Sequence, residues 1–131
     1  MPLTCSESEA KVLAGKKLAV DNAIDYVEHA LGTGLQAIPT PGHTAGAFSY
    51  LYTTRARRIL FIGDTLVPAD GEWKIWVSKA NRSIMKQTLE MLIALKFDVM
   101  ISNSFAATDG PVVELTPRRK NAHLRKVIET L

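Results

Sequence analysis

The sequence predicts an α/β fold of the α+β kind, in which a mixed β-sheet is covered by helices. Short stretches rich in aromatic, aliphatic and β-branched residues occur at 47–53, 58–62 and 98–101, which is typical of strands. Apolar residues at helical spacing occur in 83–95 and again at the end of the chain. Strands and amphipathic helices that follow one another in this way indicate a sheet with helices packed on it.

Composition indicates one small globular domain, which we expect to span residues 1–131. Hydrophobic residues make up 47% of the chain and charged residues 22%, as in ordinary globular proteins. No apolar run approaches the ~20 residues that span a bilayer, and the first residues lack the features of a secretion signal. We therefore expect a cytoplasmic protein that does not bind membranes. A single cysteine, Cys5, excludes an internal disulfide.

The net charge of +3 comes from basic residues near the end of the chain. No aromatic residues are interleaved with them for base stacking, so we interpret them as the solvated face of a terminal helix and expect no nucleic-acid partner. The residues are Arg118, Arg119, Lys120, Arg125 and Lys126.

The first part of the chain gives one clear signal and one ambiguous one. Ser6 and Glu9 have the spacing of a capping box, which predicts a helix to about residue 14 with Gly15 as its left-handed C-terminal residue. The segment 16–31 has apolar residues at helical spacing, yet 18–20 is equally typical of a strand.

The middle of the chain predicts three strands. The first spans 35–38 and stops at Pro39, which lacks a backbone donor. The next two, 47–53 and 58–62, form a hairpin around a basic turn. Because 58–62 is continuously apolar, we expect both of its faces to be covered.

The remaining third predicts a loop at 66–79, a helix, a strand at 98–101, a loop at 102–111 and a last helix. The helix at 83–95 is capped by Asn81 or Ser83, buries Met85, Leu89 and Leu92, and ends near residue 96. In the last helix Thr116 is the N-cap and Pro117 the first helical residue, and its apolar stripe indicates packing on the sheet.

Two side chains stand where predicted strands end, which is where ligands usually bind. His43 lies in the run PTPGHTAG at 39–46, whose prolines and glycines bend the chain sharply. Asp64 follows the strand 58–62 through Gly63. Imidazole and carboxylate are ordinary zinc ligands, although one such pair is more often a hydrogen-bonded loop anchor. His29 and His123 are more typical of structural histidines.

The segment 37–66 resembles the metallo-β-lactamase superfamily. In that family the pattern TPGHT-x-G, a strand pair and then Gly-Asp-Thr supply one metal-binding histidine and one aspartate that can bridge two metals. The resemblance assigns these roles to His43 and Asp64, and it implies zinc, or manganese or iron, as the metal. The helix at 83–95 and the strand at 98–101 also resemble the family's next elements. The implied fold is the C-terminal half of the family's αββα sandwich.

The rest of the family's metal site has no counterpart in this sequence. Its His-x-His-x-Asp-His motif belongs to an N-terminal half, and where the family places a last histidine this chain has SNSF at 102–105. Catalytic zinc takes three protein ligands and a water. We therefore expect that the isolated chain is not a competent hydrolase.

Two alternatives stay open. One is a metal-dependent hydrolase completed by a second subunit or an N-terminal segment, and the other is a non-catalytic interaction module. The substrate is undetermined, because the family hydrolyses β-lactams, thioesters, lactones and phosphodiesters on one scaffold.

A lone half of the sandwich exposes the sheet face that would meet the other half. We therefore predict a symmetric homodimer through that face, in which two His43 and two Asp64 side chains form a composite site if the axis passes near the loops. Beside Asp64 we expect a substrate groove. Its candidate lining residues are Thr44, Thr65, Trp73 and Trp76, although the two tryptophans are equally typical of residues that cap the end of a sheet.

Overall fold

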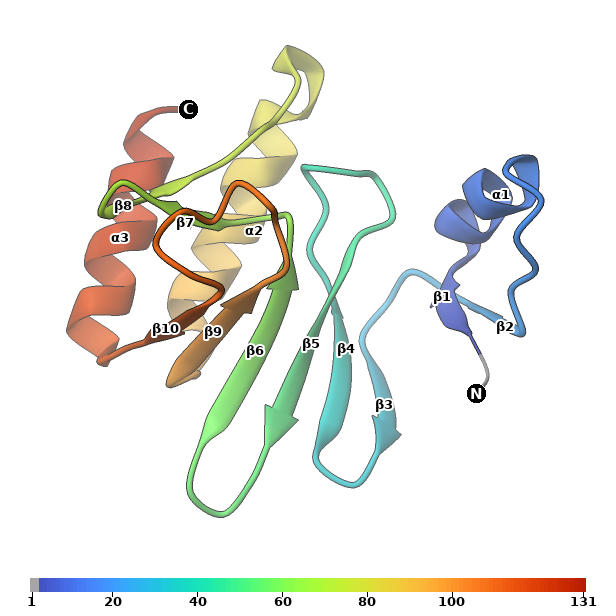
Figure 1. Cartoon of the computed structure of the whole chain (residues 1–131), viewed down its shortest axis with the longest axis horizontal. Helices are drawn as coiled ribbons and strands as arrows, with labels where there is room; N and C mark the ends of the chain where they lie inside the picture. The colour runs from blue at the N-terminus through green and yellow to red at the C-terminus, as the bar shows by residue number, and fades with distance from the viewer. Residues whose placement is uncertain (1–2) are drawn as a thin grey trace.

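A six-stranded mixed β-sheet is the largest element of the computed structural model, which describes residues 3–131 (Figure 1). Its strand order is β10-β9-β6-β5-β4-β3, and all neighbours are antiparallel except β6 and β9. The sheet confirms the predicted hairpin and the strands near 35–38 and 98–101, and it adds β10, which the sequence pattern does not reveal. The bounds are β3 (His29–Gly32), β4 (Leu35–Pro39), β5 (Phe48–Thr53), β6 (Arg58–Gly63), β9 (Val99–Ser102) and β10 (Val112–Glu114).

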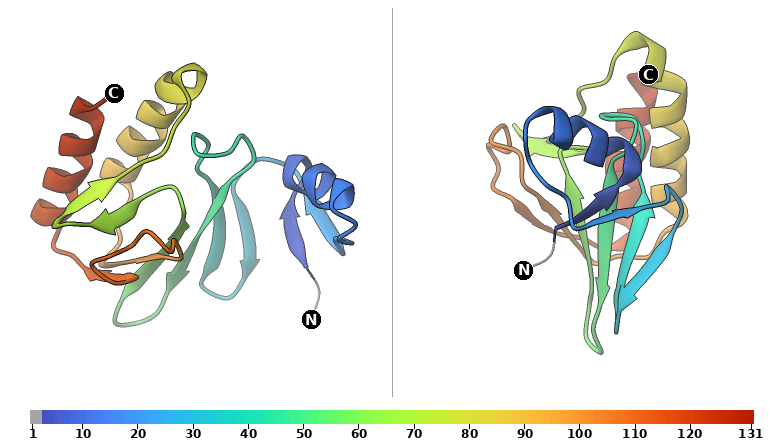
Figure 2. Two further views of the ribbon diagram at one scale, coloured as in Figure 1. Left: turned by 45° about the horizontal axis from the view of Figure 1, so that its top comes forward. Right: turned by 90° about the vertical axis from the view of Figure 1, so that its right-hand side faces the viewer.

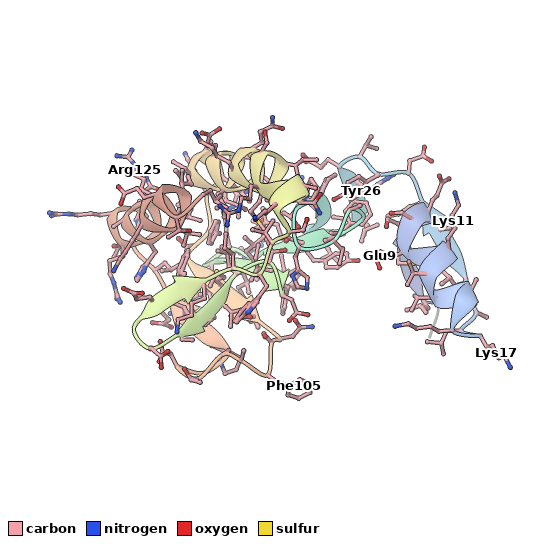
Figure 3. The ribbon with its side chains drawn as sticks, turned by 90° about the horizontal axis from the view of Figure 1, so that it is seen from above. Glu9, Lys11, Lys17, Tyr26, Phe105 and Arg125 are labelled. Carbon is pink, nitrogen blue, oxygen red and sulfur yellow. The ribbon has the colours of Figure 1, made fainter. Side chains whose placement is uncertain are left out.

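Two helices, α2 (Arg82–Ala94) and α3 (Pro117–Glu129), lie together on one side of the sheet (Figures 1 and 3). Leu89 of α2 is fully buried against sheet residues such as Leu60, and α3 packs mainly against α2 and β8. The predicted start of the last helix is confirmed, since the Thr116 hydroxyl accepts a hydrogen bond from the Arg119 amide at 3.2 Å. Within residues 3–131 no helix is long and apolar enough to cross a membrane.

The predicted solvated face of the last helix is wrong at one residue, Lys120. Its side chain is buried, and its Nζ donates hydrogen bonds to the carbonyls of Leu92, Ile93 and Leu95 at the end of α2. Those carbonyls have no partner within their own helix, so a buried cation there satisfies them and complements the helix dipole. Burial lowers the pKa of Lys120. Lys120 therefore joins α3 to α2.

The segment 66–79, predicted as a loop, contains a small hairpin. Strands β7 (Val67–Ala69) and β8 (Glu72–Lys74) pair antiparallel around Asp70 and Gly71, which both have positive φ. An Asp-Gly pair is the usual centre of a two-residue hairpin turn, so the signal was present in the sequence. A short 3₁₀ helix, η1 (Lys79–Asn81), then leads into α2.

The chain begins with what we call the N-terminal unit, residues 4–24: β1 (Thr4–Ser6), α1 (Glu7–Gly15) and β2 (Asn22–Ile24), with β1 parallel to β2. It lies at the opposite end of the molecule from α2 and α3 (Figure 2). The predicted cap is confirmed, because the Ser6 hydroxyl accepts a hydrogen bond from the Glu9 amide at 3.3 Å. Gly15 is still helical, and the left-handed residue is Lys17, with φ of 61°.

Neither interpretation of 16–31 is correct. The structure has no regular element at 18–20, and instead forms β2 and β3 on either side of a bend. Each of these strands is fixed by a partner outside the segment, β1 for β2 and β4 for β3. The partner of β2 lies 18 positions earlier in the chain, whereas β3 forms a tight hairpin with β4 in which Gly32 lies opposite Leu35. Strand pairing thus overrides the helical spacing of the apolar side chains.

The strand β6 is covered on only one of its faces within this chain. Leu60 and Ile62 point toward the helices and are 0% and 1% exposed, whereas Phe61 on the other face is 40% exposed. The expectation that both faces are covered is therefore not met by the described residues. We call this second face, opposite α2 and α3, the outer face of the sheet.

Candidate functional site

The loop 40–47 joins β4 to β5 and is held closely at both ends. The Thr40 amide donates to the Ala47 carbonyl at 2.9 Å, and the Thr88 hydroxyl of α2 donates to the Pro41 carbonyl at 2.7 Å. Gly42 has φ of 145°, and a Cβ there would lie 2.7 Å from the Met85 side chain. The sequence Pro-Gly before His43 therefore lets the loop press against α2 and fixes the direction of the histidine.

His43 is exposed on this loop, with one ring nitrogen engaged. Its Nδ1 lies 3.0 Å from the backbone carbonyl of Trp76. A carbonyl only accepts hydrogen bonds, so Nδ1 carries the proton and Nε2 of the neutral ring keeps its lone pair. Metal-ligating histidines are commonly oriented by such a hydrogen bond on their second nitrogen.

Asp64 lies just beyond β6. Gly63 has φ of 62°, and this turn brings the exposed Asp64 out at the end of the strand. The next residue, Thr65, is buried, and its amide donates to the Ile62 carbonyl at 3.3 Å. The carboxylate therefore emerges at the same end of the sheet as the loop 40–47.

Two hollows contain both His43 and Asp64. The larger has a volume of about 440 Å³ and is also lined by Trp76, Asn103, Ser104, Phe105 and Ala106. The smaller, of about 200 Å³, lies toward the N-terminal unit and includes Cys5, Thr44 and Thr65 among its lining residues. The structure thus brings together two side chains that are 21 positions apart in the sequence.

Three of the four predicted groove residues lie at these hollows, and Trp73 does not. Trp76 lines the larger hollow, and Thr44 and Thr65 line the smaller one. Trp73 is buried in the core and stacks on His123, with ring centroids 4.7 Å apart and planes 9° from parallel. Its apolar ring packs between β8 and α3. The prediction that Trp73 lines the groove is therefore wrong, and Trp73 is a core residue.

The loop 103–106 supplies lining residues that the sequence interpretation did not assign to the site. It follows β9, which is parallel to β6, so the carboxyl ends of both strands meet at one edge of the sheet. The Ser102 hydroxyl joins the two strand ends by donating to the Gly63 carbonyl at 3.1 Å. The sequence interpretation did not assign this loop to the site because it did not predict that 58–62 and 98–101 pair as parallel strands. The ring of Phe105 projects away from the fold (Figure 3).

The N-terminal unit contacts the site loop through hydrogen bonds. The Thr44 hydroxyl donates to Glu9 at 2.8 Å, and the Ser6 hydroxyl donates to the Gly46 carbonyl at 2.8 Å. The Tyr26 hydroxyl donates to the Ala47 carbonyl at 2.7 Å. Burial, and then the charge of Glu9, raise the pKa of Tyr26 to about 12, so its hydroxyl keeps the proton that this bond uses.

The metal-binding groups present do not make a complete catalytic site. Among residues 3–131 no group of three or more histidine, cysteine, aspartate or glutamate side chains is placed to hold one metal ion. His43 and Asp64 are suitable ligand types, but catalytic zinc takes three protein ligands. His29 and His123 lie elsewhere, in β3 and α3. The described residues thus supply only some of the protein ligands that a catalytic zinc ion needs.

No family model and no curated protein matches this sequence. Solved structures do match, over nearly all of the chain. DIM-1 metallo-β-lactamase has a TM-score of 0.69 and 14% identity, covering 96% of this chain and 57% of that chain. BJP-1, a subclass B3 metallo-β-lactamase of Bradyrhizobium japonicum, has a TM-score of 0.64 and 19% identity, covering 98% and 61%.

A third match is the class B3 di-zinc metallo-β-lactamase LRA-12 from an Alaskan soil metagenome, with a TM-score of 0.61 and 17% identity over 98% of this chain. The chain spans between 57% and 61% of the length of these three structures. At such low identities the likeness shows the fold. The resemblance found at 39–46 and 63–65 is thereby confirmed at the level of architecture: the chain has a metallo-β-lactamase-like fold and spans part of its length.

Proposed function

We propose that this chain carries part of a metal-dependent hydrolase site and is not a competent hydrolase on its own. The observation that supports the proposal is the meeting of His43 and Asp64 at one hollow, with Nε2 of His43 left for a ligand by the bond from Nδ1 to Trp76. LRA-12, which has a similar fold, is a di-zinc protein, so zinc is the metal we propose, with manganese or iron as alternatives.

The donor count limits what the isolated chain can do. A zinc ion held by three protein ligands lowers the pKa of a bound water to about 7, which supplies a hydroxide nucleophile. Two ligands bind the ion weakly and leave its geometry undefined. We therefore propose that further ligands come from a second subunit or from an N-terminal segment. In such a site His43 and Asp64 hold the ion, and the Trp76 carbonyl fixes the orientation of the imidazole.

A non-catalytic interaction module is the second candidate. It is favoured by the loop 102–105, which presents Asn103 and Ser104 to the hollow instead of a stronger metal ligand. In this case the hollow beside Trp76 binds a ligand without any reaction, and the domain acts by binding another molecule.

Metal binding separates the two candidates. The untagged protein is dialysed against zinc, manganese or iron, and bound metal is measured by elemental analysis and by titration calorimetry. If the chain carries part of a site, we expect weak zinc binding that is lost in His43→Ala and Asp64→Asn. The matched controls are His29→Ala and Asp70→Asn, which remove the same chemical groups away from the hollow and should retain the binding.

Hydrolysis is measured in the same preparations with chromogenic β-lactam, thioester and lactone substrates. We expect no turnover by the chain alone at any metal concentration. Turnover that disappears with His43→Ala would contradict the proposed incompetence. Metal binding that is absent, or equal in all four variants, would contradict the partial metal site and leave the interaction module.

A further inference from the structure

The outer face of the main sheet carries a group of neighbouring apolar side chains that the chain covers only in part. Register places Tyr50 opposite Phe61 and Tyr52 opposite Ile59, so these side chains share one face, and Leu35 lies beside Tyr52 on the same face. Tyr52 and Phe61 are 42% and 40% exposed. Their strand neighbours Leu51 and Leu60 point the other way and are fully buried beneath the helices.

The N-terminal unit reaches only one end of this surface, where Cys5 lines the same hollow as Tyr50. It lies beyond β3, at the edge of the sheet, in both Figure 1 and Figure 2. Its helix α1, all of which is described, has no buried residue. Tyr26, which follows the unit, packs edge-on against Phe48 at 5.2 Å between ring centroids and shields only that end of the face. The area around Tyr52 and Phe61 stays open.

The total surface of the chain agrees with a missing partner. The accessible surface is 8085 Å². A monomer of 14.4 kDa is expected to expose about 6,800 Å². The chain therefore exposes on the order of 1,200 Å² more than its mass predicts, shared between the outer face and the N-terminal unit, whose helix α1 has no buried residue. A standard interface buries roughly 800 Å² on each partner, so the excess leaves room for one such contact.

We propose that the outer face binds the outer face of a second copy of this chain, forming a two-fold symmetric dimer with two sheets packed face to face. A two-fold interface places the same patch on both subunits, so the patch must be complementary to itself. The central patch is made of five uncharged residues: Leu35, Tyr50, Tyr52, Ile59 and Phe61. The register also puts Glu114 on this face, at its β10 end, where it is paired with Arg57 in the same chain, so this edge of the face adds no net charge to the contact between two copies.

The side chains also suit sheet-on-sheet packing. Two stacked sheets lie about 10 Å apart and fill the space between them with interdigitated side chains. Aromatic rings bury a large area with little loss of side-chain freedom, and tyrosine is common in protein interfaces. This inference concerns association alone and does not depend on whether a metal binds near His43.

The test measures the mass of the full chain in solution by light scattering and sedimentation over a range of micromolar concentrations. We expect a dimer of about 29 kDa, twice the 14.4 kDa chain. Phe61→Asp and Tyr52→Lys, which each place a charge in the interface, should reduce the mass to that of the monomer. Ile84→Asp is the matched control, because Ile84 is also exposed, at 43%, but lies on α2. It should remain a dimer.

Two further measurements keep the test decisive if a variant does not fold. Circular dichroism establishes whether each variant has the wild-type content of helix and strand. The thermal midpoint of the wild-type protein should rise with protein concentration, as it does for an obligate dimer. A wild-type protein that is monomeric throughout, with a midpoint independent of concentration, would overturn the proposal and leave the face to a different polypeptide. So would a folded Phe61→Asp variant that stays dimeric.

Discussion

The two faces of the main sheet differ in how completely this chain can bury them. The inner face meets α2 and α3, and Leu51, Leu60 and Leu89 are all 0% exposed there. The outer face and the N-terminal unit, by contrast, keep large apolar side chains in solvent, including Phe61 and Val12. The residues after 35 thus carry the core of the chain on the inner side of the sheet, while the N-terminal unit is held to the loop 40–47 by hydrogen bonds.

The largest expected effect is a loss of stability on truncating a side chain of the inner face, and it tests the difference between the inner core and the N-terminal unit. Leu89→Ala removes a fully buried side chain from the inner core and should lower the free energy of unfolding by about 2–5 kcal/mol. Val12→Ala in α1, the matched truncation on an exposed side chain, should change it by less than about 0.5 kcal/mol. Urea unfolding monitored by circular dichroism measures both. Equal losses would show that the N-terminal unit buries as much as the helical side does.

A smaller loss is expected where α3 meets α2. Lys120→Met keeps much of the side-chain volume but leaves the carbonyls of Leu92 and Ile93 without their donor. Leaving buried carbonyls unsatisfied should reduce the free energy of unfolding by about 1–3 kcal/mol. The control is Lys126→Met on the same helix, since Lys126 is solvent-exposed and pairs with Glu72 at the surface. Unfolding midpoints that are the same for both variants would show that the buried contacts of Lys120 contribute nothing.

Removal of one hydroxyl group, that of Ser6, should weaken the attachment of the N-terminal unit. Ser6→Ala removes both the cap of α1 and the 2.8 Å bond to the Gly46 carbonyl. Loss of an N-cap costs about 1 kcal/mol, and here we expect it to act locally. Hydrogen exchange should accelerate several-fold in α1 and remain unchanged in α2. Acceleration in both helices would mean that the unit and the inner core unfold together.

The smallest effect is a change in pH dependence. Burial, and then the charges of Arg119 and Lys126, lower the pKa of His123 below its ordinary value of 6.5. Between the lowered pKa and 6.5 the unfolded chain binds more protons than the folded chain, so acidification through this window destabilises the fold. Above 6.5 the histidine is neutral in both states and has no effect.

His123→Phe keeps a ring stacked on Trp73 and removes the titration. The stability of this variant should therefore fall less than that of the wild type as the pH drops below 6.5. Chemical unfolding at a series of pH values measures the slope, and tryptophan fluorescence reports on the stacked pair. An identical slope in both proteins would assign the acid sensitivity to other groups.

Much of the fold can be predicted from local patterns. The cap at Ser6, the start of α3 at Thr116, the hairpin of β5 and β6 and the helix α2 each depend on residues close together in the sequence. Local propensity and local hydrogen bonds decide such elements, which is why the sequence predicted them. The short strand β2 depends on β1, 18 positions earlier in the chain. The strands β3 and β10 pair with neighbours in the sequence, β4 and β9, but with only four and three residues they carry too weak a pattern to be recognised.

The site divides in the same way. The run at 39–46 and the Gly-Asp after β6 determined by themselves that His43 and Asp64 stand at strand ends, because prolines, glycines and a buried strand act locally. Only the tertiary structure decided that both side chains share a hollow with Trp76 and the loop 103–106, and that Trp73 belongs to the core. The reason is that parallel pairing of β6 with β9, and burial between β8 and α3, join segments far apart in the chain.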